Sequence, residues 1–86
     1  MDNKIELQNL LDKVLDAIYH HRDYHCTYCC GNIEEHDDYF SFEVYGYSDQ
    51  GEGSEWTECW SIDAKGRIYS EDTTYENYED FLKDWN

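Results

Sequence analysis

Two segments, one near each end of the chain, repeat apolar residues at the three- and four-residue spacing of an amphipathic helix. The repeating positions are Leu7, Leu10, Leu11, Val14, Leu15 and Ile18 in residues 4–21, and Tyr75, Tyr78, Phe81, Leu82 and Trp85 in residues 74–85. Thr73 and Glu76 have the spacing of a capping box, which predicts the start of the second helix. We therefore expect a helix at each end of the chain.

Between these segments, apolar and polar residues alternate with the period of two that is typical of half-buried β-strands. The alternating apolar residues are Phe40, Phe42 and Val44 in residues 39–47, and Trp56, Trp60 and Ile62 in residues 55–63. Glu58 falls on the apolar face of the second strand, so we expect it near an edge or an end of the sheet. Residues 24–33, rich in Tyr, Thr and Cys, favour another extended segment, and residues 67–70 a short return strand.

Turn-forming residues separate the expected strands. Gly31-Asn32 and the polar run 34–38 predict a turn and a loop, residues 48–54 predict a flexible connection, and residues 63–66 predict a hairpin turn. The order of helix, three or four antiparallel strands and helix predicts an α+β domain of two layers, with both helices on one face of a meander.

The 86 residues are expected to form a single domain, residues 1–86, with a small core. If both helices cover one face of the sheet, the other face is free to be polar and solvated. We expect that face to present Glu43, Tyr45, Glu55 and Thr57.

Charge makes this picture more specific. The chain carries 21 acidic and 6 basic residues, a net charge of −15, and it has no lysine or arginine between Asp23 and Ala64. Because 17% of the residues are aromatic, an acidic disordered chain is a poor description of it. A central block of one sign predicts an electric field directed at a basic partner, such as a nucleic-acid-binding groove, rather than direct binding to nucleic acid.

The chain shows no signal for a membrane or for export. No segment approaches the roughly 20 apolar residues of a membrane span, and the N-terminal residues lack the basic and apolar regions of a signal peptide. We therefore expect a cytoplasmic protein with reduced cysteines, in the host cytoplasm if the protein is viral.

The cysteines offer a second kind of chemistry. Cys26 and Cys29 have the spacing of half a zinc site, and Cys30 and Cys59 are further candidate ligands. No second pair has ligand spacing, however, and on a strand Cys26 and Cys29 point to opposite faces. We expect no cofactor, and a small zinc-stabilised adaptor or regulator is the alternative. No nucleophile, phosphate-binding or metallohydrolase motif occurs, so we expect no enzyme activity.

The remaining feature is a set of carboxylates interleaved with aromatic residues. Tyrosine and tryptophan are frequent anchors of protein interfaces, and rows of carboxylates can present charge to a basic groove as a nucleic-acid backbone does. The predicted partner-binding residues are Glu34, Glu35, Asp37, Asp38, Tyr39, Glu43, Tyr45, Tyr47, Asp49, Glu52, Glu55 and Glu58.

In size, acidity, Tyr and Trp content and helix–meander–helix order, the chain resembles small phage-encoded anti-CRISPR proteins that mimic DNA, over essentially its whole length. Inhibitors of Cas9 are the most similar group. No sequence motif carries the resemblance, so no residue role is transferred. The resemblance implies a stoichiometric inhibitor that occupies the basic site with which the effector reads the protospacer-adjacent motif. An immunity protein or antitoxin that neutralises a basic nuclease would have the same electrostatics and is a further alternative. We expect the protein to be a monomer or a homodimer.

Overall fold

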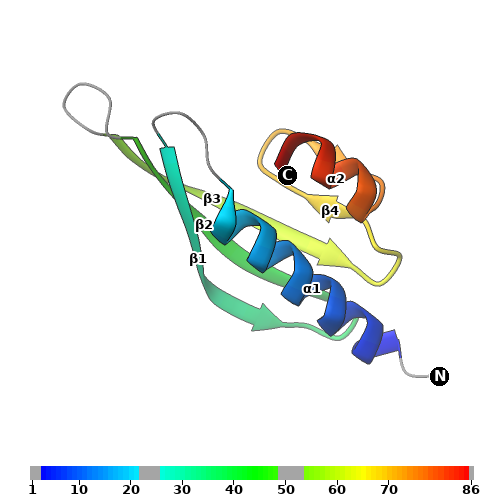
Figure 1. Ribbon diagram of the computed structural model, residues 1–86. Helices are drawn as coiled ribbons and strands as arrows, with labels where there is room; N and C mark the ends of the chain where they lie inside the picture. Colours follow the sequence, from blue (N-terminus) through cyan, green and yellow to red (C-terminus); the bar gives the residue numbers. More distant parts are fainter. Residues whose placement is uncertain (1–2, 22–25, 49–53, 86) are drawn as a thin grey trace.

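The computed structural model describes residues 3–21, 26–48 and 54–85, and these form two layers (Figure 1). The elements are α1 (Asn3–His20), β1 (Cys26–Glu35), β2 (Tyr39–Ser48), β3 (Ser54–Asp63), β4 (Ile68–Tyr69), β5 (Thr74–Tyr75) and α2 (Tyr78–Trp85). The five strands lie in chain order in one sheet, and every neighbouring pair is antiparallel. The predicted α+β meander between two helices is confirmed, with five strands where three or four were expected.

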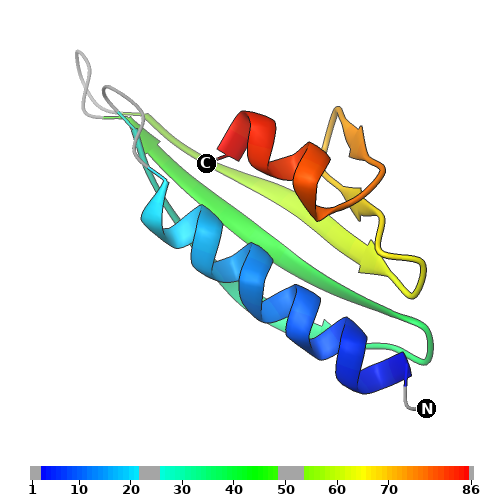
Figure 2. The ribbon, with the colours of Figure 1, turned by 45° about the vertical axis from the view of Figure 1, so that its right-hand side comes forward.

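Both helices pack on the same face of the sheet (Figure 2). The buried core that they form with the sheet comprises Leu7, Leu11, Val14, Ile18, Phe40, Phe42, Val44, Trp60, Ile62, Ile68, Tyr75 and Phe81. The strand residues between these positions point away from the helices, and we call their side of β1–β3 the open face. The alternation of apolar and polar residues along β2 and β3 therefore decides which side chains are buried and which are presented.

β1 continues through Gly31 and Asn32, where a turn was predicted. A register shift between Gly31 and Glu34 marks a β-bulge, and Asn32 adopts a φ of 49° within it. Asparagine tolerates this left-handed region better than most residues, so the same Gly-Asn pair suits a bulge as well as a turn. The chain reverses after Glu35, where the His36 amide donates to the Tyr39 carbonyl oxygen at 2.9 Å.

The second helix begins later than predicted. Thr74 and Tyr75 pair with β4 as a short strand, so the expected capping box of Thr73 and Glu76 is wrong. Asn77 caps the helix instead: its Oδ1 accepts from the Asp80 amide at 2.8 Å. A side-chain acceptor at this position satisfies an amide that has no partner within the helix.

The hairpin turn at residues 63–66 is as predicted. The Gly66 amide donates to the Asp63 carbonyl oxygen at 3.0 Å, and Gly66 has a φ of 89°. Asp63 Oδ1 also accepts from the Lys65 and Arg67 amides, which holds the turn closed. In the part of the chain that the structure describes, neither helix has the length and apolar character needed to cross a bilayer.

Candidate interaction surface

The open face is an acidic and aromatic surface without cations on β1–β3. These strands contain no lysine or arginine. Alternation places Glu34, Glu43, Glu55 and Asp63 on this face, together with Tyr39, Tyr45 and Tyr47 of β2. Some of the predicted partner-binding residues therefore lie together on this face. Their hydrogen-bond partners and exposure differ from one strand to the next.

Glu34 and Glu35 point to different sides of β1. Glu34 is opposite Ser41 on the open face, and its carboxylate lies 3.8 Å from His36 Nε2. Glu35 is opposite Phe40 and lines a shallow hollow beside Ile5 of α1. Only the first of these two carboxylates thus contributes to the open face.

The turn between β1 and β2 holds further predicted residues. Asp37 and Asp38 are exposed there. Tyr39, which follows them, stacks on the His36 ring with 4.1 Å between ring centroids and 10° between ring planes. Asp49 and Glu52, also predicted to bind the partner, lie outside the described residues.

Glu43 is bound within the protein. Its Oε1 accepts hydrogen bonds from the Tyr45 hydroxyl and the Asn32 amide group, each at 2.5 Å. The Tyr45 hydroxyl, and then Asn32, hold the pKa of the Glu43 carboxyl below its ordinary value, while the same bond to Glu43 raises the pKa of Tyr45. Glu43 is therefore already hydrogen-bonded within a small polar network, and a partner would meet it in that state rather than as a free side chain.

Glu58 lies on the helix-bearing side of β3, where its carboxylate binds two indole N–H groups beside the core. It accepts from Trp56 Nε1 at 3.0 Å and from Trp60 Nε1 at 2.9 Å. β4 pairs only with Ser61 and Ile62, so Glu58 lies beside an edge of β3 that the described strands leave unpaired, in line with the expected edge position.

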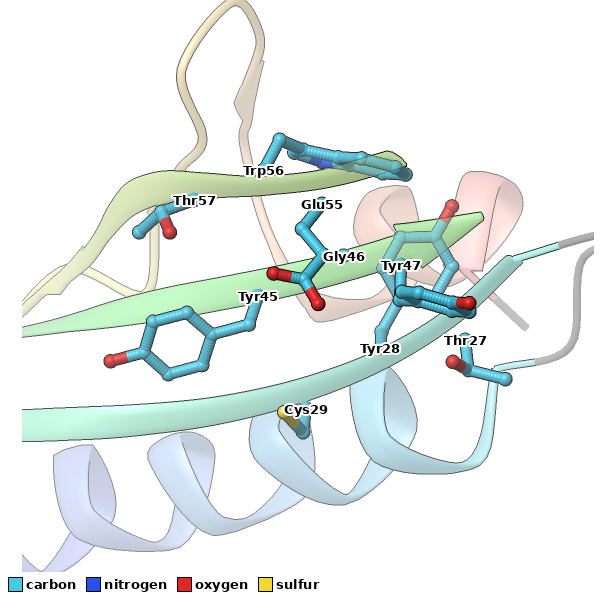
Figure 3. Close-up of a pocket in the computed structure, with 9 residues that line it drawn as sticks. All are labelled: Thr27, Tyr28, Cys29, Tyr45, Gly46, Tyr47, Glu55, Trp56 and Thr57. Atoms are coloured by element: carbon cyan, nitrogen blue, oxygen red, sulfur yellow. The ribbon is translucent and has the colours of Figure 1, made fainter. Parts of the chain in front are cut away.

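Glu55 differs from Glu43 and Glu58 because it is exposed and has no hydrogen-bond or ion-pair partner among the described residues. It is opposite Tyr47 in the register of β2 and β3, and 46% of the Tyr47 surface is exposed. Both residues border a hollow of about 380 Å³ at this end of the sheet (Figure 3). The other lining residues are Thr27, Tyr28, Cys29, Tyr45, Gly46, Trp56 and Thr57.

Gly46 allows Trp56 to pack closely against the helix-bearing side of β2 beneath this hollow. A Cβ atom on Gly46 would lie 2.3 Å from two atoms of the indole ring, so a larger residue would displace it. The Trp56 ring in turn meets Tyr28 edge to face, with 6.1 Å between ring centroids. These contacts hold β1, β2 and β3 together on the side of the sheet opposite the hollow.

The four cysteines do not form a cluster. Strand alternation places Cys26 and Cys30 on the helix-bearing side and Cys29 and Cys59 on the open face. Burial raises the pKa of the Cys30 thiol to about 12, so this thiol stays protonated at neutral pH. No group of three or more histidine, cysteine or acidic side chains in the described ranges is placed to hold a metal ion.

Two contributors to the open face were not predicted from the sequence. Asn32 binds Glu43 because the bulge turns its side chain onto this face, and Gly31 gives the Tyr45 ring room, since a Cβ there would lie 3.0 Å from that ring. The Gly-Asn pair was visible in the sequence but was interpreted as a turn. Comparison with protein-family models, curated proteins and solved structures finds no match for this chain.

Proposed function

We propose that the protein is a DNA-mimic inhibitor that occupies a basic nucleic-acid-binding site of another protein. The first target to test is a CRISPR effector such as Cas9, whose reading of the protospacer-adjacent motif depends on arginine side chains. The observation that carries the proposal is the open face, on which β1–β3 present carboxylates and tyrosines without a lysine or arginine.

The spread of the acidic groups supports this function. Asp37 and Asp38 lie at one end of β2, and Glu55 lies opposite Tyr47 at the other. At about 3.4 Å per residue, the strand separates these ends by roughly 30 Å. Charges at both ends and along the strand suit an extended basic groove better than a compact pocket.

The positions of the cations support the same orientation. Arg67 pairs with Glu76 at 3.3 Å, Lys83 approaches Asp80 at 3.9 Å, and the Lys13 ammonium lies 5.7 Å from the Tyr78 ring centroid. Each of these contacts involves α2 or the segment just before it. A basic partner that approaches the open face therefore meets strands without lysine or arginine, and only at the end of β3, where Arg67 lies near the Asp63 carboxylate, is a described cation close to an open-face carboxylate of β1–β3.

The test is competition for DNA. Guide-loaded Cas9 is bound to a fluorescent duplex that carries its motif, and the protein is added at 50, 150 and 500 mM NaCl. We expect the DNA to be displaced, with an affinity that falls steeply as salt screens the charges. The same assay is run with other CRISPR effectors and with basic nuclease toxins.

Matched variants separate surface position from total charge. Asp37→Asn, Asp38→Asn and Glu55→Gln together remove three charges from the turn and the open face. Glu6→Gln, Asp12→Asn and Glu79→Gln together remove three charges from the helices. We expect the first set to weaken displacement about tenfold or more and the second to have little effect.

The outcomes are distinct. Displacement from Cas9 or another effector supports an anti-CRISPR role, whereas displacement from a nuclease toxin alone assigns the protein to the immunity class. If no basic protein of the panel loses its DNA at 50 mM NaCl, or if the affinity is the same at all three salt concentrations, the mimicry proposal is wrong.

A further inference from the structure

The hollow on the open face arises from unequal side-chain size. Large side chains of Tyr45, Tyr47 and Glu55 stand around it, while Thr27 and Thr57 supply small side chains on the flanking strands. A sheet face of uniform side chains would be flat. In Figure 3 the Glu55 side chain reaches from β3 over β2, and its carboxylate lies between the side chains of Tyr45 and Tyr47 in that view.

One wall of the hollow is fixed. The Tyr45 ring lies against Gly31, and its hydroxyl donates to Glu43 at 2.5 Å and accepts from Asn32 at 3.1 Å. A side chain held at its ring and its hydroxyl loses little rotamer freedom when a ligand packs on it. Such preorganisation favours binding, because the ordering cost is met within the free protein.

The other two walls, formed by Tyr47 and Glu55, carry polar groups that can bind a ligand. Tyr47 is 46% exposed, and neither its hydroxyl nor the Glu55 carboxylate has a partner among the described residues. An exposed aromatic face attracts a cation through its quadrupole, and a free carboxylate forms charge-assisted hydrogen bonds. The hollow therefore combines both groups that recognise a positively charged side chain.

We propose that this hollow receives an arginine side chain of the partner protein, which stacks on the tyrosine rings while its guanidinium pairs with Glu55. Arginine fits better than lysine because the guanidinium is planar, stacks on aromatic rings and binds a carboxylate through two parallel hydrogen bonds. This inference deepens the proposed function and rests on it for the protein that supplies the arginine.

The test uses a ligand with a single positive charge, so that binding does not spread over the acidic surface. N-acetyl-arginine methylamide is titrated into ¹⁵N-labelled protein at 150 mM NaCl, and the lysine and citrulline analogues are titrated in parallel. Citrulline keeps the shape of arginine without its charge. We expect amide shifts centred on Tyr45, Tyr47, Glu55 and Thr57, largest for arginine, smaller for lysine and absent for citrulline.

Variants then assign the binding groups. We expect Glu55→Gln to weaken arginine binding about tenfold, which corresponds to ~1.4 kcal/mol, and Tyr47→Leu to weaken it by a similar factor. Glu79→Gln removes the same charge from an exposed position of α2 and is expected to leave binding unchanged. The dispersion of each variant's spectrum reports whether its fold is intact.

The result separates this inference from the proposed function. Equal shifts for arginine and lysine spread over the surface, or equal effects of Glu55→Gln and Glu79→Gln, overturn the arginine site even if the protein displaces DNA from an effector. Arginine binding in the hollow without DNA displacement from any panel protein supports the site and overturns the DNA-mimic function.

Discussion

Glu43 of β2 and Glu58 of β3 are carboxylates that accept hydrogen bonds from other side chains of the protein. Glu43 accepts from Tyr45 and Asn32 on the open face, and Glu58 accepts from two indole groups beside the core. A buried or half-buried donor left without an acceptor destabilises a fold, so both carboxylates stabilise the protein whatever they contribute to binding. Their substitution must be interpreted through folding before it is interpreted through affinity.

The Glu43 network predicts a pH effect. The folded-state pKa of Glu43 is lowered, chiefly by the Tyr45 hydroxyl, so the group stabilises the fold above its unfolded-state pKa, and this contribution is lost as the pH falls through the lowered folded-state pKa. Tyr45→Phe is expected to raise the Glu43 pKa toward its ordinary value, as measured by NMR titration of the side-chain carboxyl carbon. Tyr47→Phe is the control, and an unchanged Glu43 pKa in Tyr45→Phe would contradict the network.

Glu58 predicts a stability effect. Its two carboxylate oxygens accept from Trp56 and Trp60, whereas the glutamine amide has a single acceptor oxygen. We expect Glu58→Gln to lower the free energy of unfolding by about 1–2 kcal/mol, because one indole donor loses its partner. Urea denaturation followed by tryptophan fluorescence measures it. Glu55→Gln, which breaks no hydrogen bond among the described residues, is expected to stay within ~0.5 kcal/mol of the natural protein.

At the scale of elements, the backbone conformation of the bulge in β1 decides which side chain joins the open face. It places Asn32 at a φ of 49° and directs its side chain to Glu43 and Tyr45. A regular strand would instead direct residues 31 and 33 to the open face and the side chain of Asn32 to the helix-bearing face. The extra residue is thus the reason that three side chains from two strands meet.

Two substitutions at Asn32 separate its backbone and side-chain roles. Both Asn32→Gly and Asn32→Ala remove the hydrogen bonds to Glu43 and Tyr45, but only alanine opposes the left-handed conformation. We expect Asn32→Ala to be less stable than Asn32→Gly by about 1 kcal/mol in urea denaturation. Equal stability of the two variants would show that the bulge does not require a left-handed conformation at residue 32.

Strong periodicity in the sequence predicted the elements best. The first helix was expected over residues 4–21 and spans Asn3–His20, and the two longest alternating strands agree within one residue at each end. Tyr75 was misplaced because its three-residue spacing from Tyr78 fits a helix, whereas its pairing with Ile68 decides for a strand. That pairing depends on a contact made only after the chain has folded.

For the candidate surface, the sequence predicted the face on which each residue lies but not its side-chain partners. Alternation correctly assigned Glu43 and Glu55 to the open side of the sheet and Glu58 to the apolar side. It did not reveal that Glu43 is hydrogen-bonded while Glu55 has no partner among the described residues, because the difference depends on Asn32, which the bulge brings in from the neighbouring strand. Side-chain pairing across strands is set by register, and register is a property of the folded sheet.

At the scale of the whole molecule, one property acts in opposite directions on folding and binding. The net charge of −15 is carried on a body with extents of 49 × 24 × 20 Å, so like charges repel within it. Salt screens that repulsion over about 10 Å at 0.1 M. The same screening weakens the attraction to a basic partner.

Salt is therefore predicted to change stability and binding in opposite directions. We expect the thermal unfolding midpoint to rise between 10 and 500 mM NaCl, measured by circular dichroism, while DNA displacement weakens over the same range. The triple variant with Glu6→Gln, Asp12→Asn and Glu79→Gln has less repulsion to screen, so its midpoint is expected to rise less. A midpoint that falls with salt would mean that attractive pairs, such as Arg67 with Glu76, outweigh the repulsion.

Glu71 closes one edge of the sheet in an unusual way. β4 pairs with β3 only at Ser61 and Ile62, and the amide of Cys59 just beyond this pairing donates to the Glu71 carboxylate at 2.9 Å. A backbone amide at an open strand edge is where a second chain starts to add in fibril growth. Glu71 occupies that donor and places a negative charge beside it, so its side chain opposes the addition of a second chain at this edge.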